Sequence, residues 1–173
     1  ANQHANLFTT SNYMKVTKIT ARIRRVNGPS GGMSIDVQTA NGTDPSGTSL
    51  ATSASVLISS APTTPSGDLI DFTLTPNLEL YPSTALALVL RPDAGAVLDG
   101  SNTFRWVSSN STTTAGCTDF QIYRVSTDTG ATWGAGQNLG YRRSFFKVYA
   151  ESHSLTGSAS WVITGPTAAF WSM

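Results

Sequence analysis

The sequence predicts an all-β protein, an antiparallel β-sandwich of the jelly-roll type with a C-terminal extension. Short segments rich in β-branched and aromatic residues alternate with Gly, Pro, Asn and Asp turn signals, at intervals of roughly 8–12 residues. No segment has helical periodicity. Only 12% of the 173 residues are charged, about half the usual fraction. Ser, Thr, Gly, Ala and Asn carry the polarity instead, as is typical of extracellular β proteins.

The first long strand is expected over residues 13–26. Its apolar residues alternate up to Val16 and then change phase before Ile19. A strand that keeps one face in the core through such a change must contain an extra residue. We therefore expect a β-bulge near Thr17 and Lys18.

Further strands are expected at residues 33–39, 55–59 and 68–76, separated by loops rich in Gly and Pro. The continuous apolar run Ala85–Leu90 is typical of a strand that is buried on both faces. We expect Asn102–Ser108 to be its neighbour in space.

A hairpin is expected over residues 119–149. Its turn has the spacing S-x-D-x-G-x-T-W, made by Ser126, Asp128, Gly130, Thr132 and Trp133. In such a turn the carboxylate accepts backbone N–H groups, the glycine supplies a positive φ, and the indole ring packs beneath the hairpin. The spacing resembles the Asp-box found on hairpins of sialidases and many other β proteins.

We interpret this turn as a structural brace rather than a catalytic element. The motif occurs once, and the chain is too short for a sialidase propeller, which repeats it on several blades. Glu79 and Glu151 are its only glutamates.

The sandwich is expected to end near residue 151. Residues 152–173 form a small-residue spacer followed by two apolar bursts, whose members are Trp161, Val162, Ile163, Phe170 and Trp171. One interpretation is a last strand that covers the domain's own edge. The other is an arm that pairs with a neighbouring subunit by strand addition. So much apolar surface must dock somewhere.

Several segments occur in the order found in the bacterial and phage domains called choice-of-anchor domains. They include Phe8-Thr9-Thr10, the turn Gly28–Gly31, Leu78–Leu90 and Phe146–Tyr149. The chain resembles this family over roughly residues 6–149. The resemblance implies a β-sandwich from a secreted protein or a phage structural protein, and it carries no catalytic residues. This chain has the Trp-rich arm in place of the family's anchor helix, which favours the phage interpretation.

We expect neither an enzyme nor a bound cofactor. His4 and His153 lie near opposite ends of the chain, and for a catalytic triad either of them would need a carboxylate and an activated serine beside it. Cys117 is the only cysteine, which excludes an internal disulfide and a cysteine-based metal cage.

A Ca²⁺ site remains an alternative. It could be built from Asp68 with Asp71, or from Asp93 with Asp99, together with backbone carbonyls. Aspartates that cap turns are the more ordinary explanation in a chain so rich in Gly and Pro.

A glycan site would need a flat aromatic ring beside amides and carboxylates. Trp106, Tyr123 and Tyr141 are the candidates, although Trp106 fits core packing equally well. The cluster Arg22, Arg24 and Arg25 is expected to pair with carboxylates on strand faces.

The function we expect is a non-enzymatic structural or interaction protein of an extracellular assembly. A phage virion component, either a head decoration protein or a tail protein, fits best, with the C-terminal arm docking on neighbouring subunits of a homo-oligomer. The alternative is a secreted carbohydrate-binding or adhesion module. The net charge of +1 argues against nucleic acid or membrane partners. No signal-peptide pattern opens the chain, as expected for a virion part made in the cytoplasm. We expect the protein in the virion, or else outside the cell or at the cell surface.

Overall fold

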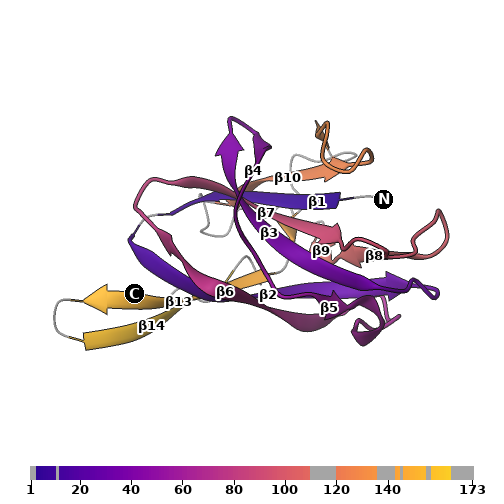
Figure 1. Ribbon diagram of the computed structural model, residues 1–173, viewed down its shortest axis with the longest axis horizontal. Coiled ribbons are helices and arrows are strands. Elements are labelled where there is room, and N and C mark those ends of the chain that lie inside the picture. Colours follow the sequence, from indigo (N-terminus) through magenta and orange to yellow (C-terminus); the bar gives the residue numbers. More distant parts are fainter. Residues whose placement is uncertain are drawn as a thin grey trace.

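The protein is an all-β sandwich of two antiparallel sheets packed face to face, in a computed structural model (Figure 1). The structure describes residues 3–10, 12–109, 120–135, 143–144, 146–154 and 157–164. Within these ranges the helical content is a single 3₁₀ turn, Ile58–Ser60. The predicted fold class is confirmed. No helix in the same ranges has the length and apolar character needed to cross a membrane.

The first sheet has the strand order β11-β10-β1-β7-β3-β4, with β5 paired to β3. Its strands are β1 (Gln3–Thr9), β3 (Gly32–Asn41), β4 (Asp44–Thr52), β5 (Val56–Leu57), β7 (Ala85–Pro92), β10 (Phe120–Ser126) and β11 (Gly134–Ala135). The central strand β7 lies between β1 and β3 and pairs with both.

The second sheet has the order β14-β13-β2-β6, with β8 also paired to β2. Its strands are β2 (Met14–Val26), β6 (Asp68–Leu80), β8 (Thr103–Trp106), β13 (Phe146–Ser154) and β14 (Gly157–Thr164). A separate two-stranded pair joins β9 (Ser108–Ser109) to β12 (Arg143–Ser144).

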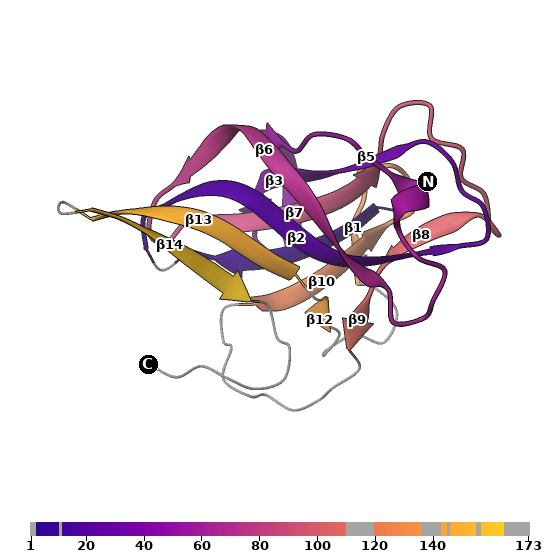
Figure 2. The same ribbon diagram turned by 90° about the horizontal axis from the view of Figure 1, so that it is seen from below.

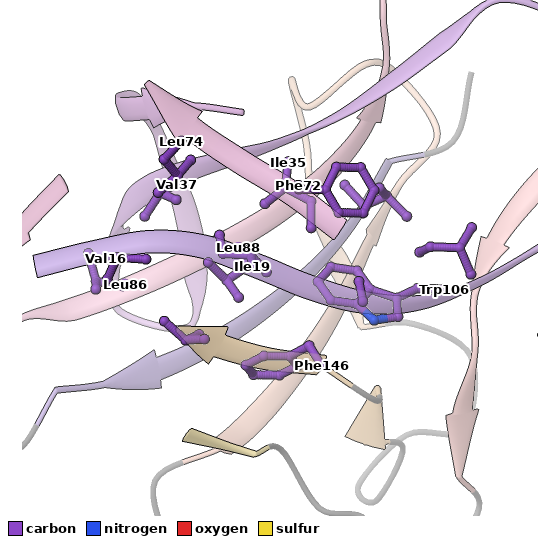
Figure 3. Close-up of a cluster of buried hydrophobic side chains, with 14 of the residues drawn as sticks. Val16, Ile19, Ile35, Val37, Phe72, Leu74, Leu86, Leu88, Trp106 and Phe146 are labelled. Carbon is purple, nitrogen blue, oxygen red and sulfur yellow. The ribbon is translucent and has the colours of Figure 1, made fainter. Parts of the chain in front are cut away.

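The core lies between the two sheets, and Figure 3 shows a central part of it. Phe72 is completely buried, and the ring of Trp106 meets that of Phe146 edge-on with their centroids 5.9 Å apart. Burying large apolar side chains of this kind stabilises a fold by roughly 1.5–3 kcal/mol each.

The apolar run in β7 is buried on both faces, as predicted. Leu86, Leu88 and Leu90 belong to the main core. Ala87 and Val89 belong to a second apolar cluster on the outer side of the first sheet.

The bulge predicted in β2 is confirmed. In the pairing of β2 with β13, Lys18 lies opposite Tyr149 and Val16 opposite Ala150, the next residue of β13, so Thr17 has no partner. Because Thr17 is the extra residue, Val16 and Ile19 are both buried in the core although three positions separate them.

Asn102–Ser108 does not pair with Ala85–Leu90, although both segments contribute side chains to the same core. The former segment forms β8 and pairs with β2 in the other sheet, where Ile23 faces Trp106. The apolar residues of β8 alternate with polar ones, which suits a strand with one buried face. Strand β7 has apolar residues on both faces and lies between two other strands. The chain therefore crosses from one sheet to the other between β7 and β8.

The sandwich is closed along one side. An isolated bridge joins Ser53, just after β4, to Leu74 of β6, and the N–H of Ala54 donates to the carbonyl of Thr73 at 2.9 Å. These contacts join the edge strands of the two sheets, so the β6 edge is partly covered.

A buried histidine makes the stability of this fold depend on pH. His4 lies in β1, and its burial, with a smaller effect of the charge on Arg105, lowers its pKa to about 4. The unfolded chain binds this proton near pH 6.5, so the free energy of unfolding falls as the pH drops from about 6.5 to 4, by on the order of 3 kcal/mol.

We expect the His4→Gln variant to lose this dependence while the wild type retains it. Urea denaturation of both proteins at pH 7 and pH 4.5 measures the difference. Equal loss of stability in the two proteins would contradict the assignment to His4.

Candidate functional site

The C-terminal apolar segment begins as an edge strand of the second sheet. β14 pairs with β13 along its whole length, from Gly157 opposite Ser154 to Thr164 opposite Lys147. Trp161 and Ile163 are the cross-strand partners of Ala150 and Val148, two residues of the core. Val162 pairs with Tyr149. The second burst, Phe170 and Trp171, lies outside the described residues.

The hairpin β13–β14 runs beyond the body of the sandwich. The pairing of β13 with β2 stops where Glu151 faces Lys15, while β13 itself continues to Ser154. Residues 152–154 therefore pair only with β14. Figures 1 and 2 show the tip of the hairpin projecting past the other strands in both views.

The outer edge of β14 carries none of the usual protection against pairing. Among the described strands, β14 has one neighbour, β13. The residues Gly157–Thr164 include no charged residue and no proline. Edge strands of soluble proteins are commonly blunted by lysine, proline or a bulge. This edge can accept a further strand through its backbone N–H and C=O groups.

The turn after β10 has a dense set of internal hydrogen bonds. The hydroxyl of Ser126 donates to Asp128 Oδ1 at 2.7 Å and accepts the N–H of Gly130 at 2.7 Å. Asp128 also accepts the N–H of Thr132 at 2.9 Å and its hydroxyl at 2.5 Å. Gly130 has a φ of 92°, a conformation that favours glycine.

This turn braces the outer side of the first sheet. Trp133 packs against the second apolar cluster, which contains Leu7 and Val89. A Cβ added to Gly130 would lie 2.9 Å from Gln3 Oε1, so the turn also approaches β1 closely. Both carboxylate oxygens of Asp128 accept hydrogen bonds from within the turn, as expected of a brace.

Of the three aromatic residues expected to bind glycan, the structure describes the side chain of Trp106 alone. Trp106 is only 3% exposed, and its ring is enclosed by the core rather than open to a sugar. Tyr123 lies in β10, but its side chain is outside the described part. Tyr141 is also outside it.

The four aspartates considered for Ca²⁺ each accept hydrogen bonds from nearby protein donors. The lysine–aspartate pair Lys18–Asp71 is an ion pair of 2.9 Å. Asp68 accepts from Leu69, and Asp71 accepts from Lys18 and Thr20. Asp93 accepts from Ser34 and Ser55, and Asp99 accepts from Ser101 and Asn102. In the part of the chain that the structure describes, no three metal-ligating side chains of His, Cys, Asp or Glu gather.

The expected pairing of the arginine cluster with carboxylates is wrong for Arg25. Its guanidinium donates to the carbonyls of Ala61 at 2.9 Å and Asn27 at 2.7 Å. Arg24 lies opposite another arginine, Arg105. The sequence carried no signal for this pair, because it depends on the register between β2 and β8.

The Asp-box turn gives a prediction about stability and pH. The hydroxyl of Thr132, followed by that of Ser126 and the backbone N–H of Thr132, holds the pKa of Asp128 far below its usual range. A carboxylate of this kind stabilises the fold above the pKa of the unfolded chain, about 3.9, and that contribution is lost as the pH falls below it. We therefore expect Asp128→Asn to lower the free energy of unfolding at pH 7.

Urea denaturation followed by far-UV circular dichroism measures this loss, and the gap between the two proteins should narrow as the pH falls below about 4. Asp68→Asn, at an exposed aspartate outside the turn, is the matched control and should lower the free energy of unfolding by less. If Asp128→Asn were as stable as the wild type at pH 7, the interpretation of this turn as a brace would be wrong.

Comparisons with known proteins found no relative of this chain. The chain matches no protein-family model, no curated protein and no solved structure. The resemblance to choice-of-anchor domains therefore stays a prediction, and the function must be argued from the residues.

Proposed function

We propose that the protein is a non-enzymatic structural protein of an extracellular assembly, which joins neighbouring copies of itself through the edge of β14. A phage virion component, as head decoration or tail protein, is the setting we favour. The observation that carries the proposal is the edge itself, an uncharged strand of eight residues at the end of a projecting hairpin.

Strand addition suits this edge for a physical reason. A second β14 laid antiparallel to the first can pair with it about a twofold axis, since the same surface then serves both partners. The backbone hydrogen bonds supply affinity, and side chains on alternate positions supply selectivity. No charge on Gly157–Thr164 opposes the contact.

Other features support a role in assembly. The opposite edge of the second sheet is bridged to the first sheet near Leu74, and β6 carries Asp68, Asp71, Pro76 and Glu79, which discourage pairing. The weakly charged surface rich in Ser, Thr and Gly suits a particle exposed to the medium.

A secreted carbohydrate-binding module built on Trp106, Tyr123 and Tyr141 is less well supported. Burial of Trp106 removes one of its three rings from solvent. The assembly role of the β14 edge is therefore the better supported function.

A single charge on β14 tests this proposal. We expect the wild type to be an oligomer that dissociates on dilution, and Val162→Lys to be a monomer, because the edge would then carry the charge that it lacks. Thr73→Lys makes the same change at an exposed position of β6, on the opposite edge, and should assemble like the wild type. Light scattering after size-exclusion chromatography gives the masses, and circular dichroism checks the folding.

A chain that stops at Thr164 separates the strand from the segment that follows it. We expect this shortened chain to assemble, because the strand itself makes the contact. A wild type that is monomeric at every concentration, an assembling Val162→Lys variant, or a monomeric shortened chain would each contradict the proposal.

A further inference from the structure

Four cations lie together on the outer face of the second sheet. Lys147, Arg22 and Arg105 each lie between two buried residues of their strands, and so point away from the core. Arg24 follows Arg22 at the next outward position of β2 and is the cross-strand partner of Arg105. We call Arg22, Arg24, Arg105 and Lys147 the basic face.

The register makes the basic face continuous. Ile23 pairs with β6 on one side and with β8 on the other. Ala21 pairs with β6 and with β13 in the same way. Strands β13 and β8 therefore lie end to end along the same side of β2. Neighbouring strands are about 4.8 Å apart, and alternate residues are about 6.8 Å apart along a strand. Each cation is therefore separated from the next by one strand spacing, by two residues along a strand, or by both.

This arrangement works against the stability of the fold. Like charges placed directly opposite each other on paired strands repel, and Arg24 and Arg105 are such a pair. Within the described part of the chain, the side chains of Arg24, Arg105 and Lys147 have no ion-pair partner. Local choices that oppose the fold without a compensating contact are expected at functional sites.

The rest of the same face is balanced in charge. Lys15 lies between Glu79 and Glu151 in the register, and Lys18 is paired with Asp71 at 2.9 Å. The positive charge is therefore concentrated at one end of the sheet, although the whole chain has a net charge of only +1. A local concentration of charge attracts a ligand of opposite sign.

We propose that the basic face binds an anionic polysaccharide, through the sulfate or carboxylate groups along its chain. The planar guanidinium of arginine matches both groups with two parallel hydrogen bonds. A row of cations along neighbouring strands suits an extended polymer. Duplex DNA fits less well, because no described element of this face could enter a groove to read bases. The site is independent of the β14 edge and of the aromatic residues first considered.

Isothermal titration at low salt tests the site with a sulfated heparin octasaccharide, an oligogalacturonate and a neutral maltooligosaccharide. The full-length protein should bind at least one of the anionic sugars but not the neutral one, and the affinity should fall as salt is added. In Arg24→Gln/Arg105→Gln the affinity should drop by about tenfold or more, since two charge-assisted contacts are lost. This variant should be at least as stable to heat as the wild type, because the opposed charges are gone.

The control is Lys15→Gln/Arg124→Gln, which removes the same charge from two positions outside the basic face. Its affinity should stay within about threefold of the wild type, because Lys15 lies between Glu79 and Glu151 and Arg124 is in the first sheet, paired with Asp44 at 2.9 Å. Binding only to the sulfated or only to the carboxylate sugar identifies the group recognised. Failure to bind either anionic sugar, equal losses in the two double variants, or tighter binding to a DNA duplex than to both sugars would overturn the proposal.

Discussion

Strand β2 must keep one face in the core over thirteen residues whose apolar pattern changes phase midway. The bulge at Thr17 resolves this conflict. It places Met14 and Val16 on the same side as Ile19 and Ile23, and all four are buried. Because β6, β13 and β8 all pair with this strand, the whole second sheet takes its register from it. The same bulge sets which residues face outward, so the basic face depends on it as well.

The first sheet is organised by a different constraint, the burial of β7 on both faces. Its inner leucines fill the space between the sheets, while Ala87 and Val89 require cover from outside. The turn at Asp128 helps to provide that cover by holding Trp133 over this side. A motif that could be taken for part of an enzyme is in this protein an element of packing.

Much of the architecture could be predicted from local patterns. The alternation of apolar residues indicated the sandwich, the phase change indicated the bulge, and the run Ala85–Leu90 indicated a strand with two buried faces. Strand neighbours could not be predicted in this way, because which strands pair is decided by the fit of whole faces. For that reason the pairing of Asn102–Ser108 with β2 and the opposition of Arg24 and Arg105 could not be foreseen. The sequence did identify Trp161–Ile163 as a docking candidate, but the hairpin that β14 forms with β13 became clear only from the pairing.

The two surfaces proposed for binding differ in their chemistry. Backbone hydrogen bonds at β14 involve no ionised group of that strand, so dissolved ions hardly weaken them, whereas contacts made by guanidinium groups are screened. Concentrated salt would therefore release a polysaccharide while the subunits stay joined, and dilute salt would allow both contacts. A particle built from this protein would hold together in any medium but adhere to a surface only in a dilute one, so that ionic strength would decide whether it stays attached or drifts free.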